Sequence, residues 1–269
     1  MGWQYKTVLM VGCTAGLGVA MAERMIEHGS FVIAVGRRKE RLDEFAAKHG
    51  PDKVATSQFD ITDLDGIKAW AEGIIKNRPA LDCVVLNAGI QRGLNFARPG
   101  NIDLGLVRKE IDTNYTSYVA LIAAFLPHLQ ARAPAASALV AVSSGLGLVP
   151  LPRCANYCAT KSALHALMWS LRAQLGADEG SRHVRVIEIV PPAVQTELHE
   201  LQDDLREAGL ANIGITIDEY MRDCWAGLEG GDEEILVGPI KANFARLEDG
   251  RRSAFGQFLA AMEAGKIPK

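Results

Sequence analysis

The sequence contains no apolar stretch long enough to cross a lipid bilayer. Its longest apolar stretches, such as residues 120–126 (ALIAAFL), fall far short of the ~20 residues that a membrane-spanning helix needs. The N-terminal segment MGWQYKTVLMVG also lacks an apolar signal core followed by a small-residue cleavage site. We therefore expect a cytoplasmic protein with no membrane partner.

Cysteine and histidine are few and are not spaced like metal ligands. The five cysteines are an odd number without paired spacing, and the six histidines show no HExxH pattern. The cysteines are Cys13, Cys83, Cys154, Cys158 and Cys224. This distribution argues against a disulfide framework and a zinc site, so we expect structural thiols and no bound metal.

An excess of positive charge is missing as well. The 29 Lys and Arg residues are balanced by 32 Asp and Glu residues, and neither Lys nor Arg alone occurs more than twice in a row. We therefore expect no nucleic-acid partner. With 48% hydrophobic residues, the composition excludes a disordered chain and fits an ordinary globular one.

What the sequence does contain is a regular alternation of strand and helix patterns. Strands are expected at residues 6–12, 31–36, 54–59, 81–86, 138–143, 184–190 and 235–238. Helices are expected at about 19–26, 39–49, 63–76 with a cap near Thr62, 102–131, 155–176 and 217–228. This alternation predicts an α/β fold, a doubly wound parallel sheet of Rossmann type with about seven strands.

The sequence shows no repeat, low-complexity tract or linker, so we expect one domain over residues 1–269. The pattern loosens after Pro192, and residues at about 192–215 are expected to form a substrate lid with a short helix. The C-terminal tail, at about 242–269, is expected to carry one helical segment near 253–264.

A glycine-rich turn follows the first expected strand. Gly12, Gly16 and Gly18 lie in GCTAGLG, directly after a strand pattern and before a helix pattern. Glycine lets the backbone approach a pyrophosphate, whose charge is favoured by the N–H groups and the positive dipole end of the helix. A plain tight turn is the alternative, but this context favours a phosphate site.

Two arginines, Arg37 and Arg38, follow the second expected strand. NAD-selective sites usually carry an acidic residue there for the ribose hydroxyl, whereas two cations suit the 2′-phosphate of NADP. Arg37 can grip the phosphate with two hydrogen bonds and stack on adenine, while Arg38 either assists or is solvated. The alternative interpretation is a charged helix start.

Four polar residues form a candidate proton-transfer group. Ser144 precedes Tyr157 by thirteen residues, and Lys161 follows Tyr157 by four, so Tyr157 and Lys161 share one helix face. Asn114 falls inside an expected helix, where its side chain competes for backbone hydrogen bonds, and a helical irregularity there would let it hold water. Each residue alone is commonplace; together with the glycine turn they predict a catalytic site.

These motifs, in this order, resemble the short-chain dehydrogenase/reductase family in its compact single-domain branch, over about residues 6–240. GCTAGLG is similar to the family's TGxxxGxG cofactor loop. Asn87-Ala88-Gly89 is similar to its NNAG motif, and its Asn-Ser-Tyr-Lys tetrad is matched by Asn114, Ser144, Tyr157 and Lys161.

Two positions depart from the family pattern. Val11 replaces the usual Thr before the first glycine, and Pro192 replaces the Gly of a Pro-Gly motif that begins at Pro191. The resulting PPAVxT sequence is similar to the DltE-like oxidoreductase subgroup. Neither departure removes a catalytic group.

The resemblance implies NADP as the cofactor, because Gly36-Arg37 is similar to the family's NADP-preferring form. Ala15 stands where many such members carry a second basic residue, so NAD is less favoured but not excluded. The implied cofactor contacts are Thr14 and Leu17 at the phosphates, Asp60 and Ile61 near adenine, Asn87, Ala88 and Gly89 along the nucleotide, and Tyr157, Lys161, Pro191, Val194 and Thr196 near the nicotinamide ribose and amide.

In the chemistry that the resemblance implies, hydride passes between the nicotinamide and a carbonyl carbon. Ser144 binds the substrate oxygen, and Tyr157 gives or takes its proton. Lys161 helps to lower the Tyr157 pKa from its ordinary value of about 10, and Asn114 connects Lys161 to solvent through water.

The segment between Ser144 and Tyr157 is largely apolar and includes Leu146, which indicates a hydrophobic ketone or secondary alcohol as substrate. Further substrate-pocket residues are expected to be Gln91, Arg153, Pro192 and His199. Arg153 either binds an acidic substrate or is a solvated residue at a helix start.

The leading hypothesis is an NADP(H)-dependent carbonyl reductase with a small-molecule carbonyl or alcohol substrate. One alternative is an NAD-dependent alcohol dehydrogenase, which Arg37 and Arg38 contradict. The other is a non-catalytic NADP-sensing protein, which has no need of the Ser-Tyr-Lys set. The resemblance also implies a homodimer or homotetramer through the helices that contain Asn114 and Tyr157.

Overall fold

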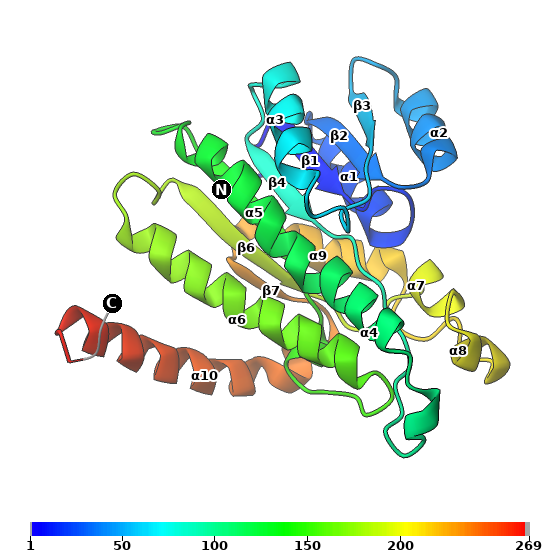
Figure 1. Ribbon diagram of the computed structural model, residues 1–269. Coiled ribbons are helices and arrows are strands. Elements are labelled where there is room, and N and C mark those ends of the chain that lie inside the picture. Colours follow the sequence, from blue (N-terminus) through cyan, green and yellow to red (C-terminus); the bar gives the residue numbers. More distant parts are fainter. Residues whose placement is uncertain (1, 267–269) are drawn as a thin grey trace.

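Seven parallel strands form one sheet at the centre of the molecule (Figure 1). The computed structural model describes residues 2–266, and within them the strand order is β3-β2-β1-β4-β5-β6-β7. Each strand lies within two residues of its expected position, which confirms the doubly wound, Rossmann-type fold. The strands are β1 (Thr7–Val11), β2 (Phe31–Gly36), β3 (Val54–Gln58), β4 (Cys83–Leu86), β5 (Ser137–Val142), β6 (Val184–Val190) and β7 (Glu234–Leu236).

Helices cover both faces of the sheet, which is why the inner strands β1, β4 and β5 are apolar and buried along almost their whole length. In β1, Val8 and Met10 pack beneath α1 (Gly16–Glu27), α2 (Lys39–His49) and α9 (Ile217–Gly230). The intervening Leu9 and Val11 pack beneath helices on the other face, namely α3 (Ile67–Asn77), α5 (Ser117–Gln130) and α6 (Ala155–Ala177). Over residues 2–266, no helix has both the length and the apolar character needed to cross a membrane.

The sheet order reverses between β1 and β4. Val8 of β1 pairs with Val32 of β2 on one side and with Cys83 of β4 on the other. The chain therefore builds β2 and β3 outward in one direction and then returns to add β4 to β7 in the other. Such a reversal leaves a crevice at the carboxyl ends of the strands, where ligands bind in doubly wound sheets.

The long helix expected at residues 102–131 is interrupted. It consists of α4 (Leu104–Ile111) and α5, joined by a π-helical turn over Asp112–Thr116, with Asn114 at its centre. The helical irregularity expected at Asn114 is therefore confirmed, whereas the continuous helix is not. A π turn accommodates one residue more than an α-helical turn.

The expected cap near Thr62 is wrong. Helix α3 begins only at Ile67, after Gly66. The backbone N–H and the hydroxyl of Thr62 instead donate to Oδ1 of Asp60, at 3.0 and 2.8 Å. Thr62 therefore closes a turn at the end of β3 rather than starting a helix.

The C-terminal helix is longer than the sequence indicates. Helix α10 spans Pro239–Glu263, whereas only about 253–264 was expected. Pro239 suits the first turn of a helix, since its missing N–H has no partner there in any case. The lid region holds two short helices rather than one, α7 (Glu197–Glu200) and α8 (Asp203–Glu207).

Substituting Gly18 should destabilise the fold. A Cβ at Gly18 would overlap the backbone oxygen of Gly12 and lie 2.6 Å from Nδ2 of Asn87, two groups that hydrogen-bond at 3.0 Å. Such crowding costs about 1–3 kcal/mol, or about 2–4 °C in melting temperature for each kcal/mol. Gly18→Ala is therefore expected to melt several degrees below the wild type in circular dichroism.

Gly73→Ala provides the matched control. Gly73 lies inside α3 with no other atom within 4 Å of an added Cβ, so alanine should leave the melting temperature unchanged or raise it slightly. Equal melting temperatures for the two variants would contradict the assigned packing of Gly18.

Candidate active site

A cavity of about 800 Å³ lies at the carboxyl ends of the strands, on the crevice side of the sheet. Nearly all of the residues expected from the sequence to form the site line it. Among those expected, Gly18 and Asn114 are not in its lining: Gly18 packs beneath the glycine turn, and Asn114 is buried behind the wall. The expected residues in the lining are Gly12, Thr14, Gly16, Leu17, Arg37, Arg38, Asp60, Ile61, Asn87, Ala88, Gly89, Gln91, Ser144, Leu146, Arg153, Tyr157, Lys161, Pro191, Pro192, Val194, Thr196 and His199.

One end of the cavity is suited to phosphate groups. Gly12 and Gly16 have φ values of 89° and 54°, which side-chain-bearing residues rarely adopt, and α1 begins at Gly16. Asn87 at the end of β4 donates from Nδ2 to the Gly12 oxygen, at 3.0 Å, and so fixes the turn. The free N–H groups of the first turn of α1 therefore face the cavity end, where an anion is favoured.

The two arginines after β2 differ in their contacts. Arg38 donates from Nη2 to Oγ1 of Thr14, at 3.0 Å, and from Nη1 to Oε2 of Glu197 in the lid, at 2.7 Å. Arg37 is half-exposed, with Nη1 at 3.6 Å from Oδ2 of Asp60. Arg38, which the sequence left as either assisting or solvated, is thus held in place by a lid carboxylate.

Asp60 carries a negative charge beside this arginine pair. Burial acts to raise the pKa of Asp60, but hydrogen bonds from Thr62 and the nearby Arg37 guanidinium outweigh it and hold the pKa below its usual value. An ionised Asp60 therefore lies beside Arg37 in the wall of the cavity.

Ser144, Tyr157 and Lys161 come together at the opposite end of the cavity. Ser144 follows β5 and its Oγ accepts a hydrogen bond from the Leu146 N–H, at 3.1 Å, which leaves the hydroxyl hydrogen available. Tyr157 lies in the first turn of α6, and Nζ of Lys161 lies 5.7 Å from the centre of its ring. The Lys161 ammonium donates to the Val142 oxygen, at 2.9 Å.

Burial controls the proton affinities of this group. It raises the pKa of Tyr157, an effect that the neighbouring Ser144 hydroxyl offsets only in part. Burial also lowers the pKa of Lys161 to about 8, against the opposing charge of Glu188. Without a cofactor, Tyr157 is therefore a protonated hydroxyl at neutral pH, which suits a proton donor.

Asn114 supports the site from behind. Its Oδ1 accepts from the Ile90 N–H, at 2.9 Å, and its Nδ2 donates to the Ile90 oxygen and to Oγ1 of Thr160, at 2.8 and 3.2 Å. Asn114 thereby fixes the loop after Gly89. A water link from Asn114 to Lys161 stays a prediction.

The wall around the Ser144 end is mostly apolar, and two of its expected polar residues already have partners. Nη1 of Arg153 donates to Asp204 of α8, at 2.6 Å, and Nη2 donates to Gln202, at 2.7 Å. Gln202 in turn donates to Oε1 of Gln91, at 3.0 Å. Arg153 and Gln91 therefore hold the lid. This contact is neither of the two roles considered for Arg153, which were binding an acidic substrate and being solvated at a helix start.

His199 is a polar residue of the wall with one ring nitrogen that has no hydrogen-bond partner among residues 2–266. Its side chain is buried, and within the described part of the chain its Nδ1 has no hydrogen-bond partner. Burial and the neighbouring charge of Arg153 lower the pKa of His199, so the imidazole is neutral at pH 7. His199 therefore lines the cavity as a neutral ring whose Nδ1 is buried in the wall.

Several lining residues have no signal in the sequence. Glu197, Ile240 and Phe244 line the cavity from the lid and from α10. They lie far along the chain from the motifs, and Glu197 meets Arg38 across a separation of 159 residues. In the part of the chain that the structure describes, no cluster of His, Cys, Asp and Glu suits a metal ion, and all five cysteines are free and buried.

Comparison with known proteins gives a consistent picture. The family model "short chain dehydrogenase" matches residues 6–206. An uncharacterized oxidoreductase, DltE, of Bacillus subtilis is 39% identical over 257 residues, 96% of each chain. A benzil reductase ((S)-benzoin forming) of Saccharomyces cerevisiae is 30% identical over 206 residues, 75% of each chain.

Among solved structures, a short chain dehydrogenase from Burkholderia cenocepacia in complex with NADP superimposes with a TM-score of 0.74. It is 26% identical, and the match covers 96% of this chain and 99% of that one.

The protonation of Tyr157 can be measured directly. In the cofactor-free protein, burial should keep Tyr157 protonated to above pH ~10, its ordinary pKa. We expect the difference between the near-ultraviolet phenolate titrations of the wild type and Tyr157→Phe to be flat below that pH. A phenolate band in the difference spectrum near neutral pH would contradict the assigned environment.

Proposed function

The chain belongs to the short-chain dehydrogenase/reductase family and is an oxidoreductase, and on this premise we propose that it is an NADP(H)-dependent carbonyl reductase. The observation that carries the proposal is the meeting of Ser144, Tyr157 and Lys161 in the same cavity as a glycine turn and an arginine pair. The first set moves a proton, and the second holds a dinucleotide phosphate.

The cavity residues fit a dinucleotide. The glycine turn at Gly12 and Gly16 and the first turn of α1 form an anion site at one end of the cavity, and Lys161 lines the other end. Arg37 and Arg38 present half-exposed guanidinium groups beyond the glycine turn, where a 2′-phosphate can accept charge-assisted hydrogen bonds. The NADP complex of the Burkholderia cenocepacia relative supports the same cofactor.

The reaction divides between the cofactor and the chain. When bound, the nicotinamide supplies the hydride. The Ser144 hydroxyl donates a hydrogen bond to the carbonyl oxygen, since its own oxygen already accepts from Leu146. Tyr157 gives that oxygen a proton, and the charge of Lys161 favours the phenolate that remains.

The proposed substrate is a hydrophobic ketone. Leu146, Val149 and Leu151 line the Ser144 end of the cavity, and Arg153, the cation of the same segment, is paired with Asp204. An acidic substrate would have to compete with that pair. The yeast relative, a benzil reductase, supports a carbonyl substrate of apolar character.

An NAD-dependent alcohol dehydrogenase remains the second candidate because of one observation. Asp60 and Glu197 lie beside Arg37 and Arg38, so the charge of the arginine pair is partly neutralised. Two unopposed cations would favour the 2′-phosphate more strongly.

The complete Ser-Tyr-Lys set argues against a non-catalytic sensor.

Cofactor choice and turnover can be tested together on a panel of ketones, aldehydes and quinones. The value of kcat/KM with NADPH should exceed the value with NADH by about tenfold or more, because one charge-assisted hydrogen bond to the 2′-phosphate contributes that much binding free energy. Arg37→Ala should remove most of that preference. Tyr157→Phe should lower kcat by about 10²–10⁴-fold.

Each result has a defined contrary outcome. A strong preference for NADH in the wild type would reject the role of Arg37. NADPH binding without turnover of any carbonyl, and with no effect of Tyr157→Phe, would favour the sensor.

The lid carboxylate should oppose NADPH binding. Glu197 accepts from Arg38 and lies 3.6 Å from Arg41, so it competes with a phosphate for the same cations. Glu197→Gln should lower the Kd of NADPH by up to about fivefold, the value of a half-exposed ion pair, and leave that of NADH unchanged. Fluorescence titration measures both constants.

Glu200→Gln is the control, because Glu200 lies on the same short helix and is exposed. An equal change in both variants, or an equal gain for NADH, would show that Glu197 does not compete at the phosphate site.

A further inference from the structure

Helix α10 is attached to the rest of the protein with few buried side chains. Of its 25 residues, only Ile240 and Glu248 are buried, and Phe258 is 64% exposed. In Figure 1 the helix runs alongside α6 at the edge of the molecule. Apolar burial along α10 is therefore sparse, and its buried carboxylate is a major point of attachment.

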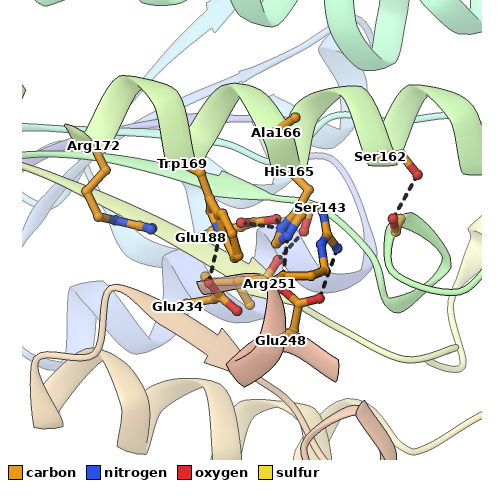
Figure 2. A network of polar contacts seen from close by, with 12 residues as sticks. Ser143, Ser162, His165, Ala166, Trp169, Arg172, Glu188, Glu234, Glu248 and Arg251 are labelled. Carbon is orange, nitrogen blue, oxygen red and sulfur yellow. Dashed lines mark hydrogen bonds and ion pairs between the residues drawn. The ribbon is translucent and has the colours of Figure 1, made fainter. Parts of the chain in front are cut away.

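Glu248 contacts a histidine that the proposed reaction does not use. Its Oε2 lies 3.1 Å from Nε2 of His165 on α6, and Nδ1 of the same ring lies 2.9 Å from Oε2 of Glu188 on β6 (Figure 2). The side chains of all three are at most 1% exposed. Because both ring nitrogens face carboxylate oxygens, both must donate, and the ring is an imidazolium.

The other charges around His165 are compatible with this state. Burial alone would lower the pKa of His165, but the hydrogen bonds to Glu188 and Glu248 outweigh it and raise the pKa to about 9. The remaining charged groups near the ring are Lys161 one turn earlier on α6, Glu234 on β7, and Arg251 and Arg252 on α10. Arg251 and Arg252 are themselves paired with Glu248 and Glu234.

The same face of α10 reaches the active site. Ile240, Phe244 and Glu248 follow one another at intervals of four residues, so they share one side of the helix. Ile240 and Phe244 line the cavity. A Cβ on Gly145, the residue after Ser144, would overlap Cδ1 of Ile240, so the first turn of α10 lies directly against the Ser144 loop.

We propose that the buried Glu188–His165–Glu248 bridge positions the substrate-binding wall, by holding α10 where Ile240 and Phe244 close the cavity beside Ser144. His165, Glu188 and Glu248 are then positioning residues for substrate, and they do not touch the reacting atoms. The role in substrate binding rests on the function proposed above. The attachment of α10 by the bridge does not.

The test compares Glu248→Ala with Glu248→Gln, which keeps an acceptor for His165. Asp249→Ala is the control, because Asp249 is the next residue on α10 and its side chain is 72% exposed. Glu248→Ala should raise KM for a bulky ketone about tenfold, the effect of losing a charge-assisted hydrogen bond, with kcat within about twofold and the Kd of NADPH unchanged. The KM of Glu248→Gln should lie only slightly above the wild-type value, and the KM of Asp249→Ala should equal it.

A second readout needs no turnover. Trypsin should cleave at Arg251 and Arg252 about tenfold faster in Glu248→Ala, because α10 detaches more often once the bridge is broken. The bridge is fully formed below the unfolded-state pKa of His165, about 6.5, and is lost as the pH rises through about 9. Cleavage of the wild type should therefore approach that of Glu248→Ala above that pH.

These readouts separate the two proposals. If the wild type reduces no carbonyl, the proposed function fails, but fast cleavage of Glu248→Ala still supports the bridge. The bridge is rejected if Glu248→Ala matches Asp249→Ala in both KM and cleavage, or if kcat falls with KM unchanged. If Glu248→Ala does not fold, Glu248→Gln decides: its KM must exceed that of Asp249→Ala, and equality rejects the proposal.

Discussion

Burial of charge beneath α6 is the constraint on which the rest of the site depends. Lys161 and His165 lie one turn apart on the same helix, and both are almost completely removed from solvent. Two buried cations in such proximity would be costly without a counter-charge. Glu188, inside β6, faces both: it accepts a hydrogen bond from His165 and opposes the fall in the Lys161 pKa.

This arrangement gives two adjacent turns of α6 different tasks. The Lys161 side serves the cavity, where Tyr157 and Ser144 meet a substrate oxygen. The His165 side receives α10, which returns to the cavity through Ile240 and Phe244. Proton transfer and the shape of the substrate wall thus depend on one helix and one strand carboxylate. The lid closes the opposite wall through Arg153, Gln202 and Gln91.

Much of the fold and the core of the site were predictable because their signals are local. Buried parallel strands give continuous apolar runs, and the glycine turn, Ser144 and the Tyr157–Lys161 pair each follow a strand or share a helix turn. The contacts that the sequence did not reveal are long-range and polar. Glu197 meets Arg38 across 159 residues, and Glu248 meets His165 across 83. No periodicity in the sequence marks such pairs, and the sparse apolar face of α10 concealed its length. The oligomeric state stays a prediction.

The π turn at Asp112–Thr116 has a consequence for sequence length. It inserts one residue beyond α-helical spacing between α4 and α5 while the two remain nearly continuous. Because the wide turn already absorbs this extra residue, deleting one residue there would give a regular α-helix and would leave Tyr118, Leu121 and Phe125 of α5 packed against the sheet. The cost would fall on the turn itself, where Asn114 holds the loop after Gly89 through its two hydrogen bonds with Ile90. The extra residue therefore serves the site rather than the packing of the fold.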